Sequence, residues 1–247
     1  MGEHSRIIKL DATDSTNVYL KELVQSMSLP DYTVVVAKKQ LKGRGQMGSV
    51  WQSEEGKNLT FSMLKKFNIL HAEQQFLLNI GVSLAICDVL QSLSIPNIKV
   101  KWPNDIMSGS SKICGILIEN LLKGQLVQFS IIGIGLNVNQ TDFGNLDRAA
   151  SLRAITGNFY DLDELLHNIL DSLYFHLDRL EEQKFDQLLS PYEKLLFRKD
   201  KPSTFTGADG DMFMGFIRGV SSEGKLVLEL EDQIFKEFDL KEVTLLY

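Results

Sequence analysis

A loop rich in glycine and cationic residues is the first part of the sequence whose composition could do chemistry. It runs from Lys38 to Asn58 and contains the segment Gly43-Arg44-Gly45-Gln46-Met47-Gly48. The residues around that segment include Lys38, Lys39, Lys42 and Trp51. Glycines let backbone N–H groups face an anion, cations neutralise it, and an indole ring offers a flat face to a base. The loop therefore predicts an anion-plus-base ligand such as a nucleotide, with a flexible surface loop as the alternative.

The same segment matches the G-x-G-x-x-G pattern of dinucleotide-binding folds, but its surroundings exclude that kind of site. In such folds the glycines open a helix, and an acidic residue follows about 20 residues later. Here Ser49-Val50-Trp51-Gln52-Ser53 follows, with Gly56 soon after, and no acidic residue lies near that distance. The loop is therefore not interpreted as a dinucleotide-binding turn.

Two further segments place amide, carboxylate and ammonium groups close together in the sequence. In Lys101-Trp102-Pro103-Asn104-Asp105 the proline forces a turn, with the amide and the carboxylate at its tip. Lys112 begins a predicted strand that extends to Glu119, and Gly115 inside it indicates close approach to the backbone. Each segment also has an ordinary interpretation, namely an Asn-Asp turn and a lysine in solvent.

A third segment, Gly133-Ile134-Gly135-Leu136-Asn137-Val138-Asn139, ends a predicted strand with two glycines and two amides. Alone it indicates a bulge followed by a turn. Metal ligation is not predicted, because the four histidines form no i,i+4 pair and Cys87 and Cys114 lack a metal-binding spacing. We interpret Cys114 as a small buried strand residue.

The elements that must position these segments follow from the hydrophobic pattern. Ile7–Leu10 is a short predicted strand, and Asp14-Ser15-Thr16-Asn17 is a helix N-cap signature with Ser15 as the cap. Later strands are predicted at 33–37, 59–64, 98–102, 106–107, 113–119 and 126–134, and helices at 72–93, at 162–180 and up to about 197. The last four strands follow one another through short breaks, so we expect them to pair antiparallel.

The pattern changes after residue 200. Residues 204–247 read as short alternating strands, punctuated by glycines at Gly207, Gly210, Gly215, Gly219 and Gly224. Such a pattern predicts a small β-barrel. We therefore predict an α+β domain over residues 1–199 and a small β-barrel domain over residues 200–247.

The composition of the 247-residue chain is that of an ordinary globular protein, with 44% hydrophobic and 23% charged residues. These fractions exclude a disordered or low-complexity chain. A net charge of −6 gives no general attraction for nucleic acid or anionic lipid. The N-terminal residues hold no apolar signal-peptide run, and the longest uncharged stretch, Gly124 to Thr141, is too polar for a membrane span. Two cysteines without a disulfide framework fit a reducing compartment. We therefore predict a cytoplasmic protein that binds neither membrane nor nucleic acid.

Taken together and in order, these segments resemble the biotin–protein ligases. The matching residues are Asp14-Ser15-Thr16-Asn17, Gln40, Gly43 to Gly48 with Trp51, Lys101 to Asp105, Lys112 to Leu117 with Glu119, and Gly133 to Asn139. The resemblance covers essentially the whole chain, because the glycine-rich segment after residue 200 is similar to the family's C-terminal barrel. It implies an α+β biotin–lipoate ligase domain of the class II aminoacyl-tRNA synthetase type, followed by an SH3-like β-barrel.

The resemblance also implies a two-step reaction. Biotin and MgATP give biotinyl-5′-adenylate and pyrophosphate, and a lysine of a biotin carboxyl carrier protein then attacks the mixed anhydride. The catalytic residues it implies are Lys112, Arg44 and Asp105. The biotin-binding residues it implies are Ser15, Thr16, Asn17, Gln40, Gly43, Arg44, Gly45, Gln46, Lys112 and Gly115. The ATP-binding residues it implies are Trp51, Asn104, Asp105 and Asn137, with Mg²⁺ expected near Asn104 and Asp105 but its ligands not assigned.

Two departures from the family pattern bear on function. Some members carry arginine where this chain has Gln46, so one cation near the adenylate is missing and the retention of the intermediate is open. Some members also carry an N-terminal DNA-binding domain, whereas the matching segments here begin within about ten residues of Met1, so we expect the monofunctional form. Two alternatives stay open, a lipoate or octanoate ligase of the same fold and a non-catalytic biotin or nucleotide sensor. The sequence is compatible with a monomer or a homodimer.

Overall fold

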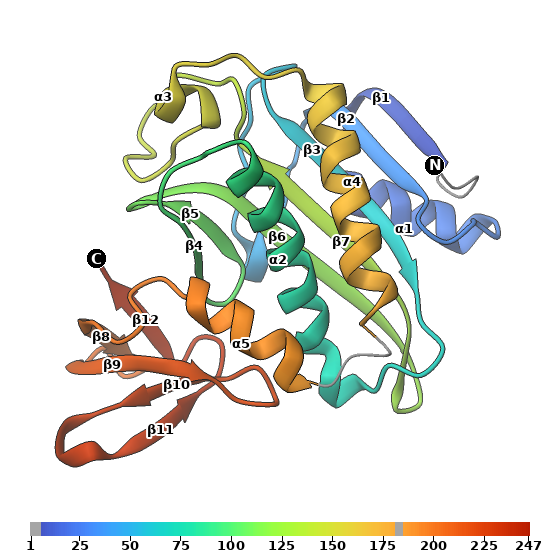
Figure 1. Ribbon diagram of the computed structural model, residues 1–247. Coiled ribbons are helices and arrows are strands. Elements are labelled where there is room, and N and C mark those ends of the chain that lie inside the picture. Colours follow the sequence, from blue (N-terminus) through green and yellow to red (C-terminus); the bar gives the residue numbers. More distant parts are fainter. Residues whose placement is uncertain (1–5, 181–184) are drawn as a thin grey trace.

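A seven-stranded mixed sheet forms the centre of the molecule in the computed structural model, which describes residues 6–180 and 185–247 (Figure 1). The strand order is β1-β2-β3-β7-β6-β5-β4. The strands are β1 (Ile7–Thr13), β2 (Val34–Gln40), β3 (Leu59–Lys66), β4 (Ile98–Lys101), β5 (Asp105–Ser108), β6 (Ser111–Lys123) and β7 (Leu126–Leu136). Only β1 and β2 pair in parallel, so the predicted antiparallel pairing of the four consecutive strands β4 to β7 is confirmed.

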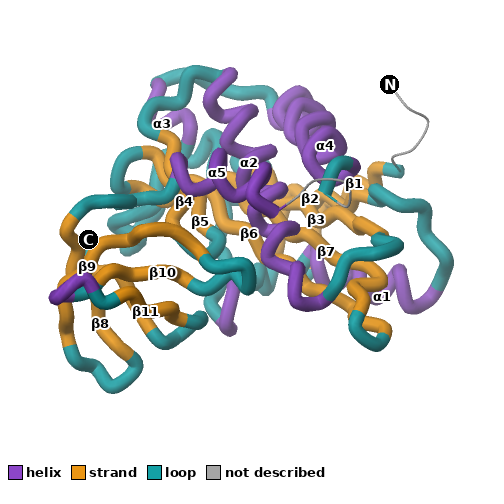
Figure 2. The backbone as a smooth tube through the Cα atoms, turned by 60° about the horizontal axis from the view of Figure 1, so that its bottom comes forward, coloured by secondary structure: helices purple, strands orange, loops and turns teal. Residues whose placement is uncertain are grey.

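The two faces of this sheet carry different helices. Helices α2 (Gln75–Ser92), α4 (Leu162–Asp178) and α5 (Phe185–Leu195) lie on one face, and α1 (Thr16–Ser26) lies on the other (Figure 2). The alternation of strand side chains explains this division. On β2, Val34 joins the large core beneath α2, whereas Val35 packs with Leu20 of α1 in a smaller cluster.

Helix α2 is apolar on every side because it is surrounded by protein. It packs against α4, α5, β4 and β6. Together with the preceding turn it is the one helix in the described residues long and apolar enough to cross a membrane, and 67% of that stretch is buried inside the fold. A helix that is hydrophobic all round is typical of such a core position.

A short helix, α3 (Leu152–Thr156), was absent from the sequence-based prediction. Its first turn is closed by Ser151, whose hydroxyl accepts a hydrogen bond from the Ala154 backbone N–H at 3.0 Å. Gly157 ends it in the left-handed conformation that commonly terminates helices. One and a half turns are too short for the hydrophobic periodicity on which the prediction depends.

The last part of the chain forms a separate five-stranded antiparallel sheet in the order β11-β10-β9-β8-β12. Its strands are β8 (Pro202–Gly207), β9 (Met212–Val220), β10 (Leu226–Glu229), β11 (Phe235–Phe238) and β12 (Val243–Leu246). The predicted small β fold is therefore present. Its buried side chains, such as Phe205 and Leu228, belong to the same continuous core as the large sheet. The division at residues 199/200 stays a prediction about independent domains.

One side-chain hydrogen bond joins the small sheet directly to the Lys101–Asp105 turn. The Trp102 indole N–H donates to the Gly224 carbonyl at 2.9 Å. Gly224 has φ +87, and an added Cβ would lie 2.3 Å from the ring of Phe76 on α2. Glycine is therefore required there both by the backbone conformation and by the close approach of α2.

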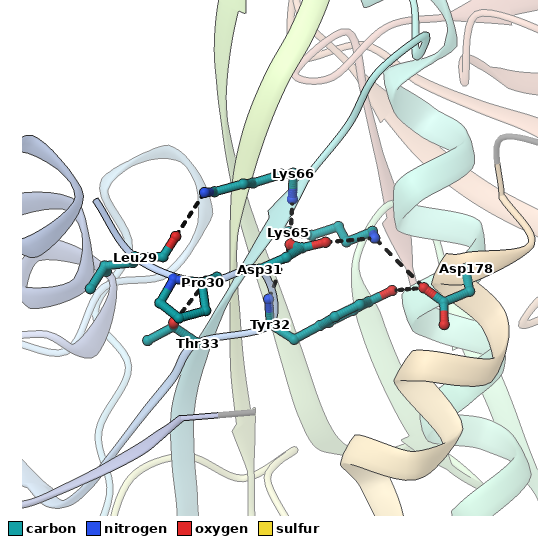
Figure 3. Close-up of polar contacts among 8 residues, drawn as sticks. All are labelled: Leu29, Pro30, Asp31, Tyr32, Thr33, Lys65, Lys66 and Asp178. Atoms are coloured by element: carbon teal, nitrogen blue, oxygen red, sulfur yellow. Dashed lines mark hydrogen bonds and ion pairs between the residues drawn. The ribbon is translucent and has the colours of Figure 1, made fainter. Parts of the chain in front are cut away.

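The C-terminal end of α4 is attached to the large sheet by a polar cluster around Tyr32 (Figure 3). The Tyr32 hydroxyl donates a hydrogen bond to the Asp178 carboxylate. The Lys65 ammonium lies 3.0 Å from Asp31, 3.7 Å from Asp178 and 4.2 Å from the centre of the Tyr32 ring. Burial, and then the hydrogen bond to Asp178, raise the pKa of Tyr32 well above its usual value, so the phenol stays neutral and keeps donating.

Candidate active site

A pocket of about 280 Å³ lies on the α1 face of the large sheet. Its walls come from the start of α1, the loop after β2, the β4–β5 turn, and strands β6 and β7. The sequence-predicted residues that line it are Ser15, Thr16, Asn17, Gln40, Arg44, Gly45, Gln46, Trp51, Asn104, Asp105, Lys112 and Gly115. Together with Phe61 of β3, residues from six separate segments of the sequence thus meet in one cavity.

The floor of the pocket is made of three glycines on adjacent strands. Gly115 of β6 pairs directly with Gly135 of β7, and Gly133 lies two residues away on the same face. An added Cβ would lie 2.9 Å from the Trp51 ring at Gly115, 2.4 Å from it at Gly135, and 2.3 Å from the Asn17 amide at Gly133. The missing side chains therefore let an indole ring and an amide lie directly on the sheet, as Gly115 alone had indicated.

Neutral hydrogen-bonding groups form one end of the pocket. The Gln40 side-chain oxygen accepts from the Thr16 backbone N–H at 2.9 Å and from its hydroxyl at 3.2 Å. The buried Ser62 hydroxyl contacts Thr16 Oγ1 at 2.7 Å and Asn17 Oδ1 at 2.6 Å. The Asn17 amide also donates to Glu119 at 2.8 Å. This network fixes the orientation of the Thr16, Asn17 and Gln40 side chains.

Ser15 lies at the N-cap position of α1, as predicted, but the described residues show no capping hydrogen bond from its side chain. The residue is 3% exposed and lines the pocket. Its hydroxyl is therefore available to a ligand at the neutral end rather than committed to the helix.

Charged groups form the other end of the pocket. The Lys112 ammonium lies 2.6 Å from the Asp105 carboxylate and 5.5 Å from the centre of the Trp51 ring. The Asn104 side-chain N–H donates to the Ile116 carbonyl at 2.7 Å, which fixes the amide beside them. Arg44 is exposed at the rim, and the described residues offer it no ion pair. Lys101 also lines the pocket, so three cations accompany one carboxylate among its lining residues.

The loop between β2 and Trp51 folds back on itself, so the prediction of an irregular loop is wrong in part. Strand β2 continues to Gln40, and Arg44 and Val50 form an isolated β-bridge. The Trp51 backbone N–H donates to the Gly43 carbonyl at 3.0 Å. An added Cβ at Gly43 would lie 2.3 Å from the Trp51 carbonyl oxygen. These contacts place the indole ring on the glycine floor. There the indole N–H is buried without a hydrogen-bond partner in the described part of the chain.

Comparison with known proteins shows to which family this chain belongs. The model of the biotin/lipoate A/B protein ligase family matches residues 10–137, a little over half of the chain. The chain belongs to this family.

Similar proteins of known name are biotin–protein ligases. The bifunctional ligase/repressor BirA of Escherichia coli K12 is 31% identical over 96% of this chain and 73% of its own length. The biotin–[acetyl-CoA-carboxylase] ligase of Paracoccus denitrificans is 27% identical over 89% of this chain and 92% of its own. The structure of Aquifex aeolicus biotin protein ligase in complex with biotin and ATP matches with a TM-score of 0.81, at 30% identity and 98% coverage of both chains.

Two of the residues that the resemblance to this ligase family implied, Gly43 and Asn137, do not line the pocket within the described structure. Gly43 contributes indirectly, because its missing side chain lets the Trp51 backbone carbonyl approach closely. The Asn137 side chain donates to the Ala150 carbonyl at 3.1 Å, while its backbone carbonyl accepts from Leu152. Asn137 thereby holds the segment 148–152, which runs beside Lys112, while its side-chain oxygen is buried without a hydrogen-bond partner in the described part of the chain. Its predicted role in ATP binding stays a prediction.

Other lining or supporting residues of this ligase site were missed by the sequence-based list. They include Ser62, Lys101, Gly133 and Gly135. The glycines belonged to a recognised motif and Lys101 to another, so the signal was present but not assigned to the pocket. Ser62 had no such signal, because a serine inside a predicted apolar strand is indistinguishable from an ordinary core residue.

Proposed function

We propose that the protein is an ATP-dependent biotin ligase. It would activate biotin as biotinyl-5′-AMP, with release of pyrophosphate, and transfer the biotinyl group to a lysine of a biotin carboxyl carrier protein. The main support is the polarity of the pocket on the α1 face of the large sheet. Neutral hydrogen-bonding groups at Thr16 and Gln40 suit a ureido ring, and the cations Lys112 and Arg44 at the other end suit a carboxylate.

The glycine floor supports the nucleotide half of this proposal. Trp51 lies flat across Gly115 and Gly135, so one face of the indole rests on the sheet and the other can meet a base. The Aquifex relative, 30% identical to this chain, is in complex with both biotin and ATP. A pocket that accepts both ligands side by side would bring the carboxylate to the α-phosphate.

Magnesium would enter this site with the nucleotide. The described residues contain no group of three or more His, Cys, Asp or Glu that could hold a metal by themselves. Mg²⁺ at phosphoryl-transfer sites is commonly held by one or two carboxylates and by substrate phosphates. Asp105 and the amide oxygen of Asn104 fit that mode, and the metal would supply charge neutralisation at the phosphates.

The test is incubation of the protein with biotin, MgATP and a carrier domain, followed by intact-mass measurement. We expect the carrier mass to increase by one biotinyl group, and we expect no increase when the acceptor lysine of the carrier is replaced by arginine. An unmodified carrier in the presence of all three substrates would contradict the proposal.

The shared family name keeps a lipoate ligase as the second candidate. Parallel reactions with lipoate or octanoate and a lipoyl domain distinguish the two, because only one carrier should be labelled. A non-catalytic sensor would release no pyrophosphate in the presence of biotin and MgATP.

A further inference from the structure

Two cations beside the pocket share one aromatic ring. The Lys101 ammonium lies 4.9 Å from the centre of the Tyr247 ring, and the Arg148 guanidinium carbon lies 4.3 Å from it. Phe197 meets the same ring edge-on, at 5.1 Å between centroids. The ring is therefore held from one side by an aromatic neighbour, while it attracts both cations through its π face.

Neither cation has a counter-charge in the described structure. Among residues 6–180 and 185–247, no ion pair joins Lys101 or Arg148 to a carboxylate within 4.0 Å, whereas the Lys112 ammonium forms an ion pair with Asp105. Like charges that share a ring repel each other, and the ring only partly offsets this repulsion. An anion with charge on several oxygens would satisfy both cations at once, as arginine and lysine commonly do with phosphates.

Both cations are directly connected to the charged end of the pocket. Lys101 lines the pocket, and in the register of the β4–β5 hairpin it stands directly opposite Asp105. The two side chains therefore lie on the same face of the sheet. The Arg148 carbonyl accepts from the Lys112 N–H at 2.7 Å. Each cation is thus a backbone neighbour of one member of the Lys112–Asp105 pair.

The sheet register gives the direction from the glycine floor to these cations. Lys101, Asp105, Gly115 and Gly135 form one continuous cross-strand row over β4, β5, β6 and β7. Neighbouring strands are roughly 4.8 Å apart, so Lys101 lies about 10 Å beyond Gly115 on the far side of Asp105. That distance is appropriate for a polyphosphate that starts near Lys112 and extends away from the Trp51 ring.

We propose that Lys101 and Arg148, held together by Tyr247, bind the two terminal phosphates of ATP and the pyrophosphate formed from them. This inference rests on the proposed function. In the first step a biotin carboxylate oxygen forms a bond to the α-phosphorus. The bond from that phosphorus to the oxygen bridging to the β-phosphate breaks, and its electron pair leaves on pyrophosphate. The three residues would stabilise that leaving charge.

The small β fold thereby contributes to the site, because Tyr247 directly follows β12. Tyr247 is a positioning residue in this arrangement, since it acts through the two cations. A ring without the hydroxyl should serve equally well, so Tyr247→Phe should behave as the wild type.

The experiment measures binding of inorganic pyrophosphate with Mg²⁺ by calorimetry, together with the KM for ATP and for biotin. We expect Arg148→Gln, Lys101→Gln and Tyr247→Leu each to weaken pyrophosphate binding and to raise the KM for ATP by about tenfold. The KM for biotin, and carrier labelling from added biotinyl-5′-AMP, should be unchanged. Arg153→Gln, at an exposed arginine of neighbouring α3, is the matched control and should alter none of these values.

Wild-type pyrophosphate affinity in both Arg148→Gln and Lys101→Gln would overturn the proposal, as would equal weakening of biotin binding. Thermal denaturation identifies any variant that fails to fold, and the comparison of Tyr247→Leu with Tyr247→Phe separates loss of the ring from loss of the hydroxyl. Calorimetry requires no turnover. Pyrophosphate binding without carrier labelling would therefore refute the ligase function and leave the anion site intact.

Discussion

At the scale of single residues, Lys112 has the most direct chemical role to test. A carboxylate and an α-phosphate repel as they approach, and unit charges ~4 Å apart at an effective dielectric of ~20 interact by ~4 kcal/mol. Lys112 stands 2.6 Å from Asp105 in the pocket, so its charge is pre-placed for this encounter. We predict that Lys112→Ala lowers biotin-dependent pyrophosphate release by about 10²–10³-fold, as measured in a coupled pyrophosphate assay.

The same variant should be less impaired in labelling a carrier from added biotinyl-5′-AMP, because that step bypasses the first meeting of like charges. Lys123→Ala is the matched control, since Lys123 lies at the exposed end of the same strand, β6. Adenylate formation at the wild-type rate in Lys112→Ala would show that Lys112 is only a solvated lysine.

Substitution of Gly135 tests, also at the scale of single residues, whether the glycine floor positions Trp51 for ATP. A Cβ there would lie 2.4 Å from the Trp51 ring, so Gly135→Ala must displace the indole. Base–aromatic stacking contributes roughly 1–3 kcal/mol, so we predict that the KM for ATP rises by about tenfold while the Kd for biotin changes little. Steady-state kinetics and calorimetry check this. Gly124→Asn, in the β6–β7 turn with open space around it, is the control, and an unchanged KM for ATP in Gly135→Ala would argue against stacking on Trp51.

At the scale of elements, the loop from Lys38 to Trp51 is held by backbone hydrogen bonds but buries little. Leu41, Met47 and Val50 are 62%, 52% and 69% exposed, so few apolar contacts oppose opening. We predict that biotin with MgATP protects the loop from trypsin, with cleavage after Lys42 and Arg44 monitored by mass spectrometry. Cleavage after Lys123, at the exposed end of β6, serves as the internal control. Equal cleavage of the loop with and without ligands would contradict the prediction.

The attachment of α4 to the sheet is a second element-scale feature. Tyr32→Phe removes the hydrogen bond to Asp178 but leaves the Lys65–Asp178 ion pair at 3.7 Å. Because the Asp178 side chain is 62% exposed, the loss should be about 1 kcal/mol, which lowers Tm by about 2–4 °C in a chain of this size. Differential scanning calorimetry measures it, with Tyr19→Phe on α1 as the control. Ligase activity should be unchanged, since Tyr32 lies outside the pocket, and an unaltered Tm would show that the hydrogen bond adds nothing.

At the scale of the whole molecule, charge bears on what the 247-residue chain can bind. Some relatives are named bifunctional ligase/repressors, and this chain spans 73% of the Escherichia coli protein. The net charge is −6, and no segment of the sequence resembles a recognition helix in a basic context. We predict no nanomolar, sequence-dependent DNA binding at physiological salt, which fluorescence anisotropy with operator and scrambled duplexes would test. Tighter binding to one duplex than to the other would overturn this.

The sequence by itself determined the local features of the protein. Glycine positions, the proline turn at Pro103, the N-cap at Ser15 and the apolar periodicities specify which segments become strands, helices and turns, because each depends on neighbours along the chain. The ordered motifs also indicated candidate ligand-binding residues, most of which line one pocket.

The tertiary structure alone decided which of these residues meet. Ser62 joins Thr16 and Asn17, and Lys101 joins Arg148 at Tyr247, only because strand order and register bring distant segments together. A one-residue shift of β3 or of β4 would turn Ser62 or Lys101 to the other face of the sheet. Register depends on packing across the whole core rather than on local preference, so Asn137 could be recognised as a motif residue from the sequence, while its position outside the pocket could not.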